Sequence, residues 1–170
     1  MKSTPAATLS ALIFLAALAP QTRAEEATDV LVKAKMLFNF TQPQYAKWPV
    51  SAFSDAASPF VIGVVGDDSV AGKLEGLVSK QTVGDRRISV RRGEMKGCHL
   101  VFIGKAESGR AGSILTAANV LTVGDAENFM QQGGAIGFFL KGEKIRFHIN
   151  AKAASRAGVD LTGRLLGAGE

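Results

Sequence analysis

Four charged residues follow the apolar runs of this chain closely enough to share one site. They are Asp67, Asp68, Lys105 and Asp125. The runs, 60–65, 100–103 and 120–123, each end at a glycine, as strands do in strand–turn–helix units of a parallel sheet. Ligands of such sheets bind beyond the carboxyl ends of the strands, so the four residues are a candidate small-ligand site. The alternative is structural, because aspartate after glycine at a helix start caps that helix.

Catalytic motifs are missing from the sequence. Cys98 and His99 are neighbours at the start of a strand, where successive side chains point to opposite faces, so they do not form a shared metal site or a nucleophile–base pair. The stretch 104–111 is similar to a phosphate-binding loop, but Arg110 and Ala111 replace its lysine and hydroxyl residue. We therefore predict a protein that is not an enzyme and has no cofactor or metal.

Cys98 is the single cysteine of the chain, so no disulfide can form within one subunit. It precedes the apolar run 100–103, which predicts a buried and inert thiol. The alternative, an intermolecular disulfide or a redox-sensing thiol, requires an exposed sulfur with a lowered pKa.

The amino-terminal residues predict export. Lys2 precedes the apolar run 11–19, and the small residues Thr22 and Ala24 follow at the positions that a signal peptidase reads. We predict a signal peptide over residues 1–24, cleaved after Ala24, and one mature domain over residues 25–170. Its removal takes away two basic residues, Lys2 and Arg23, and lowers the formal net charge from +5 to +3. That charge is too small to favour nucleic acid as a partner.

The mature sequence alternates strands with helices. Helices are predicted at 28–40, with Thr28 or Asp29 as the cap, and at 70–79, 106–118 and 126–131. Strands are predicted at 60–65, 88–92, 100–103, 120–123, 135–140 and 144–149. Gly142 and Glu143 form a turn between the last two strands, and a helix capped by Asn150 ends at Gly158. These elements predict a three-layer, Rossmann-like α/β domain, with a mostly parallel sheet of five or six strands and helices on both faces.

The aromatic connection, residues 45–53, carries Tyr45, Trp48 and Phe53 between the first helix and the first strand. Pro49 and Pro59 interrupt regular structure in this region, and such aromatic residues commonly cover the edge of a core. Aromatic residues also dominate the energy of protein interfaces, so the three are candidates for a partner-binding surface.

An ordered set of motifs resembles the YfiR family over nearly the whole mature length. The motifs are K-A-K-M-L-F-N-F at 33–40, W-P at 48–49, F-V-I-G-V-V-G-D-D at 60–68, G-C-H-L-V-F-I at 97–103, V-L-T-V-G-D at 120–125, G-G-A-I-G-F at 133–138, R-F-H-I-N-A-K-A-A at 146–154 and A-G-V at 157–159. The resemblance implies a periplasmic Rossmann-like domain, often dimeric, that acts by binding. It implies that the partner is the periplasmic sensor region of an inner-membrane diguanylate cyclase, whose repression lowers cyclic di-GMP and biofilm formation.

The sequence departs from that resemblance in several features. The segment 41–47 is about two residues longer than is usual in the family, and Cys98 stands alone where some members have cysteine pairs. Repression gated by a disulfide within one subunit is therefore excluded. Two functions remain open: a regulatory protein that binds the cyclase, and a small-ligand sensor or scavenger that uses the strand-end loops.

Overall fold

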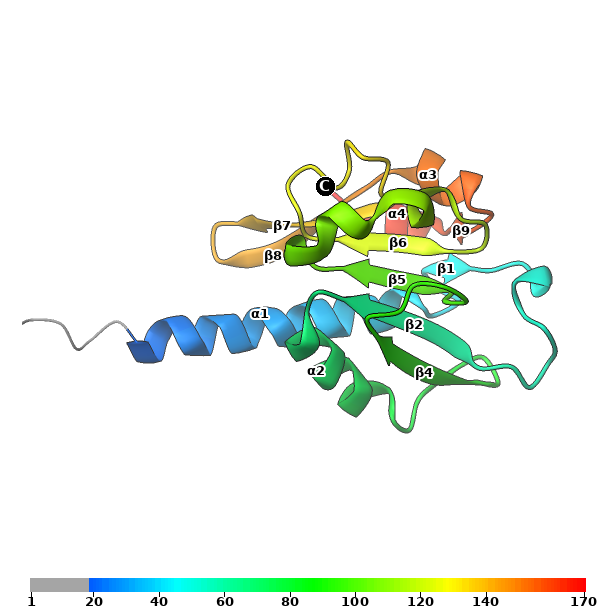
Figure 1. Cartoon of the computed structure of the whole chain (residues 1–170), viewed down its shortest axis with the longest axis horizontal. Coiled ribbons are helices and arrows are strands. Elements are labelled where there is room, and N and C mark those ends of the chain that lie inside the picture. Colours follow the sequence, from blue (N-terminus) through cyan, green and yellow to red (C-terminus); the bar gives the residue numbers. More distant parts are fainter. Residues whose placement is uncertain (1–18) are drawn as a thin grey trace, which may run out of the picture.

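The computed structural model describes residues 19–170, and a seven-stranded sheet forms its centre (Figure 1). The strands, in spatial order, are β3 (Thr82–Val83), β4 (Arg86–Arg92), β2 (Phe60–Val65), β5 (Leu100–Ile103), β6 (Leu121–Gly124), β7 (Ile136–Lys141) and β8 (Lys144–Ile149). Strands β4, β2, β5, β6 and β7 run parallel, while β3 and β8 pair antiparallel at the two edges. The predicted α/β class with a mostly parallel sheet is confirmed.

The sheet has seven strands, one more than the upper predicted number of six. The additional strand, β3, has two residues, which is too short to show an alternating pattern in the sequence. Two further short strands, β1 (Ala46–Lys47) and β9 (Asp160–Leu161), form a separate antiparallel pair. This pair fastens the aromatic connection to the end of the chain, because Thr162 N–H also donates to Tyr45 O at 2.9 Å.

The sheet buries both of its faces. The four α-helices, which contribute side chains to the larger core on one face, are α1 (Ala19–Phe40), α2 (Asp68–Val78), α3 (Ala151–Arg156) and α4 (Gly163–Leu166). Phe60 and Ile62 of β2 point into this core, whereas Val61 between them belongs to the smaller core on the opposite face. Phe129 fills the centre of the smaller core and is fully buried.

The smaller core is covered by short 3-10 helices, so the prediction of a helix over 106–118 is wrong. The chain there forms η2 (Lys105–Arg110) and η3 (Gly112–Thr116). Glu107 interrupts η2 with non-helical angles, and Gly112 has a positive φ of 24°, which prevents one continuous α-helix. The predicted helix at 126–131 is a series of turns.

Helix α1 begins at Ala19, earlier than the predicted start at residue 28. Thr28 does not cap it, because its hydroxyl donates to Ala24 O one turn earlier, at 2.9 Å. Of the predicted signal peptide, residues 1–18 lie outside the described residues, and cleavage after Ala24 stays a prediction. Over residues 19–170 no helix is both long and apolar enough to cross a membrane.

Candidate functional site

Asp125 links three elements at the carboxyl edge of the sheet. Its carboxylate accepts a hydrogen bond from Lys105 N–H at 2.6 Å and pairs with Lys33 Nζ of α1 at 2.5 Å. The Lys33 and Asp125 side chains are only 17% and 14% exposed. The structural alternative offered by the sequence, that Asp125 caps a following helix, is therefore wrong. It joins α1 to the ends of β5 and β6.

Sequence reasoning missed Lys33, although a signal for it exists. Val30, Ala34 and Leu37 form the inward stripe of α1, and Lys33 lies beside that stripe at helical spacing. A lysine at such a position needs a partner to offset the loss of water, and Asp125 provides one.

Asp67 and Asp68 take the structural role that the sequence offered as the alternative. Asp67 is the N-cap of α2 and accepts a hydrogen bond from Val70 N–H at 2.9 Å. Asp68 is exposed in the first turn of the same helix, where a negative charge is favourable. Of the four predicted ligand-binding residues, the structure brings Lys105 and Asp125 into direct contact, and the two α2 residues serve the helix start.

A cavity of about 570 Å³ opens beside the Lys33–Asp125 pair. Its lining includes Asp29, Lys33, Lys105, Asp125, Phe139 and His148. The ring of His148 stacks on Phe139 with centroids 4.1 Å apart. This carboxyl-edge cavity thus offers charges of both signs beside an aromatic wall.

The aromatic connection packs against the beginning of strands β2 and β5. Trp48 lies 4.7 Å from Phe60, edge to face, and its Nε1 donates to His99 O at 3.0 Å. Phe53 stacks on the His99 ring, with the ring centroids 4.4 Å apart. The Arg86 guanidinium lies over the Phe53 ring, 3.8 Å from its centroid. Tyr45, Trp48 and Phe53 are half-buried and cover the edge of the larger core. Their predicted role in partner binding therefore depends on the exposed part of each ring.

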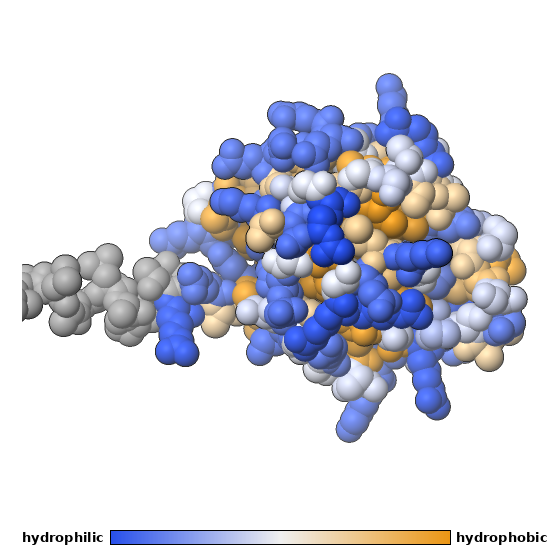
Figure 2. All heavy atoms as spheres, in the orientation of Figure 1, coloured by the Kyte–Doolittle hydropathy of each residue, from blue (hydrophilic) through white to orange (hydrophobic). Residues whose placement is uncertain are grey.

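Within this connection, η1 (Val50–Ala52) exposes Val50 to solvent at 86% of its surface. The other exposed large hydrophobic residues of the described chain, Leu140 and Leu166, are less exposed than Val50. Figure 2 shows hydrophobic surface at the end of the molecule where η1 lies, on the right of the view. The turn η1 therefore exposes an apolar side chain next to the packed rings of Trp48, Phe53 and His99, the aromatic platform.

His99 holds the aromatic platform in place through hydrogen bonds of both its ring nitrogens. Nδ1 accepts a hydrogen bond from Val61 N–H at 3.0 Å, so Nε2 carries the proton and donates to Ala52 O, also at 3.0 Å. A protonated ring would direct a second N–H at the N–H of Val61. Burial, assisted by the positive charge of Arg86, lowers the pKa of His99 below its ordinary value.

We expect the free energy of unfolding to fall as pH drops below about 6.5, the ordinary pKa of histidine. In that range the unfolded chain binds a proton at His99 that the folded chain excludes, so acid favours unfolding. Chemical denaturation between pH 7.5 and 5 measures the slope. His99→Gln retains a donor and an acceptor without the titration and should flatten it; an unchanged slope in this variant would contradict the assignment.

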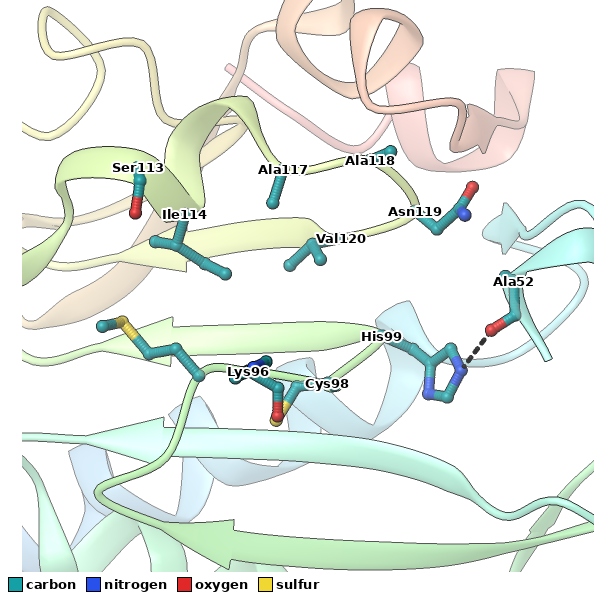
Figure 3. A pocket seen from close by; sticks show the side chains of 12 residues that line it. Ala52, Lys96, Cys98, His99, Ser113, Ile114, Ala117, Ala118, Asn119 and Val120 are labelled. Atoms are coloured by element: carbon teal, nitrogen blue, oxygen red, sulfur yellow. Dashed lines mark hydrogen bonds between the residues drawn. The ribbon is translucent and has the colours of Figure 1, made fainter. Parts of the chain in front are cut away.

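A groove of about 470 Å³ lies next to η1, between η3 and the segment that precedes β5 (Figure 3). Ile114, Ala117 and Val120 face the 96–99 segment across this η3 groove. Cys98 contributes to the lining but is only 4% exposed as a residue. The predicted burial of the thiol is confirmed, and this burial raises the pKa of Cys98.

Cys98 should react slowly with a thiol reagent in the folded protein. We expect labelling with a maleimide at pH 7 to be at least about tenfold slower than in denaturant, because a buried thiol with a raised pKa forms little accessible thiolate. The comparison needs one time course in each condition. Equal rates would restore the redox-sensing alternative.

Among residues 19–170, no three His, Cys, Asp or Glu side chains gather as a potential metal-binding group. Cys98 and His99 both border the η3 groove, but the His99 ring is committed to Val61 and Ala52. Arg86 and Arg92, two of the four arginines of β4, also have partners. Arg86 donates to the carbonyls of Asp55 and Ser58, and Arg92 forms a two-pronged pair with Glu75.

The fold and these surfaces define a Rossmann-like α/β domain with a cavity at the carboxyl edge of its sheet and a groove beside an exposed apolar turn. The model of the YfiR/HmsC-like family matches residues 31–170, and the chain belongs to this family. At the level of the family, this membership supports a role in the regulation of diguanylate cyclases. Comparison with curated proteins gave no match.

Proposed function

We propose that this chain is a non-catalytic periplasmic protein that represses a membrane diguanylate cyclase by binding its periplasmic sensor region. Membership of the YfiR/HmsC-like family is the observation that carries the proposal. Repression would lower cyclic di-GMP and, through it, biofilm formation. The protein must bind the inactive state of the cyclase more tightly than the active state, since equal affinity for both would leave the equilibrium unchanged.

The proposed contact surface consists of Val50 and the half-buried rings of Tyr45, Trp48 and Phe53 beneath it. Support comes from the 86% exposure of Val50 and from the hydrogen bonds that hold the aromatic platform, those of Trp48 Nε1 and of the His99 ring. A preorganised apolar projection loses little conformational entropy on binding. The η3 groove beside it would receive an apolar side chain of the partner.

Deletion of the gene for this chain tests the regulatory role. The expected result is a rise in cellular cyclic di-GMP and in biofilm mass, both restored by the wild-type gene. Levels that do not change on deletion would contradict repression.

A small-ligand sensor is the second candidate function, favoured by the mixed charge and aromatic wall of the carboxyl-edge cavity. Lys105 and Asp125 would then act together with Lys33, while Asp67 and Asp68 remain with α2. Screening amino acids, nucleotides and anions for shifts in melting temperature tests it. The two functions are compatible, because a ligand could release the partner.

A homodimer remains part of the proposal, and light scattering of the purified chain measures it.

A further inference from the structure

The outer edge of β8 holds one acidic residue of the same chain. Within residues 19–170 β8 is the last strand of the sheet, so its outer side has no partner strand. Glu170 N–H donates to Phe147 O on that side at 3.0 Å, as a residue of an added strand would. The edge of β8 therefore accepts an extended segment.

The side chain and carbonyl of Glu170 are also recognised. Its carboxylate pairs with Lys141 Nζ at 2.5 Å and with Arg146 Nε at 3.3 Å, and its carbonyl oxygen lies 2.8 Å from His148 Nδ1. The hydrogen bond and charge of Lys141, together with Arg146, lower the pKa of Glu170. These contacts from β7 and β8 select a negatively charged side chain at one position along the edge.

Glu170 occupies this edge weakly. Its contacts are the backbone hydrogen bond to Phe147, the contact of its carbonyl oxygen with His148 and two exposed ion pairs, and ion pairs in contact with solvent are weak. Hydrogen bonding alternates along an antiparallel strand, so Ile145, two residues from Phe147, also directs its backbone groups outward. In the described chain these groups of Ile145 have no hydrogen-bond partner. An incoming strand could therefore exchange for Glu170 and gain bonds that Glu170 leaves unmade.

We propose that the β8 edge is a docking site for an extended, acidic segment of another protein, and that Glu170 holds the site closed by occupying the position of its acidic residue. Charge decides the type of occupant. Lys144 and Arg146 on the exposed face of β8 would repel the same residues of a second copy, whereas they attract carboxylates. The inference goes beyond the proposed repression and does not depend on it.

A labelled peptide tests the site on the full chain without the cyclase. The probe is the fluorescein-labelled hexapeptide Thr-Glu-Val-Thr-Glu-Val, with Thr-Lys-Val-Thr-Lys-Val as its control, and binding is measured by fluorescence polarisation. Glu170→Gln weakens the internal contact, so this variant should bind the acidic peptide at least about fivefold more tightly than the wild type. Addition of the peptide should slow hydrogen exchange at the Ile145 and Phe147 amides.

Two further variants locate the contact. Arg146→Glu should lose binding, and Lys152→Glu, an exposed charge reversal on α3, should bind as the wild type does. Equal affinity of wild type and Glu170→Gln, equal affinity for the two peptides, or peptide binding that leaves Ile145 and Phe147 unprotected would each overturn the proposal. So would the absence of any binding.

Discussion

Replacement of Phe129 by alanine is expected to lower the free energy of unfolding by about 3–5 kcal/mol, the usual cost of removing a fully buried aromatic side chain. Phe129 is 0% exposed and is the largest side chain in the smaller core. The 3-10 helices and turns that cover this face are short, so they depend on its packing. Denaturation in urea measures the loss. A change below about 1 kcal/mol would contradict this account of the smaller core.

The glycines around Phe129 give a sharper version of the same test. A Cβ at Gly134 would lie 2.1 Å from the Phe129 ring, and one at Gly124 would lie 2.5 Å from it. Gly134→Ala should therefore destabilise by roughly 1–3 kcal/mol through overpacking. The matched control is Gly76→Ala in α2, where no atom lies within 4 Å and the better helix former should stabilise by up to about 1 kcal/mol. Equal effects of the two substitutions would refute the packing argument.

The second large effect is expected at the Lys33–Asp125 pair. Lys33→Met and Asp125→Asn should each lower the free energy of unfolding by about 2 kcal/mol. Either change removes one charge of the pair and leaves the other charge mostly buried and without its partner. The value lies below the ~3–5 kcal/mol typical of fully buried pairs. The double variant should lose less than the sum of the single losses, and the difference is the coupling energy.

The Arg92–Glu75 pair is the natural control for this cycle. Its two side chains are 45% and 42% exposed, so solvent screening should keep its coupling energy well below that of the Lys33–Asp125 pair despite good geometry. Denaturant unfolding of both sets of variants gives the comparison. A Lys33–Asp125 coupling no larger than that of the control would contradict the role of this pair in holding α1 to the sheet.

Strands were predictable where their pattern was long enough. The runs 60–65 and 100–103 match β2 and β5, because short apolar stretches that end at a glycine have few alternative structures. The run 144–149 matches β8, because its apolar and polar residues alternate. The two residues of β3 carry no such pattern and pair only because β4 lies beside them. The helix predicted over 106–118 failed for the opposite reason, since its alanines favour a helix while Gly109 and Gly112 and the packing on Phe129 favour tighter turns.

The site was predictable in part. Asp67 and Asn150 cap helices, as their positions after a strand indicated. The pairing of Asp125 with Lys33 joins residues 92 positions apart, and local spacing does not contain that information. The exposure of Val50 was equally hidden, because it follows from the hydrogen bonds that turn the Trp48 and His99 rings inward.

Direct binding to the cyclase tests the central proposal. Titration of the chain onto the purified periplasmic sensor region of an inner-membrane diguanylate cyclase should give saturable binding. Val50→Asp should weaken that binding at least about tenfold, since a buried charge is costly at the centre of an interface. The control is Leu140→Asp, an equally polar change at an exposed leucine of β7, at the other end of the sheet, and it should bind as the wild type does. No binding by the wild type, or equal binding by Val50→Asp, would contradict the proposed surface and function.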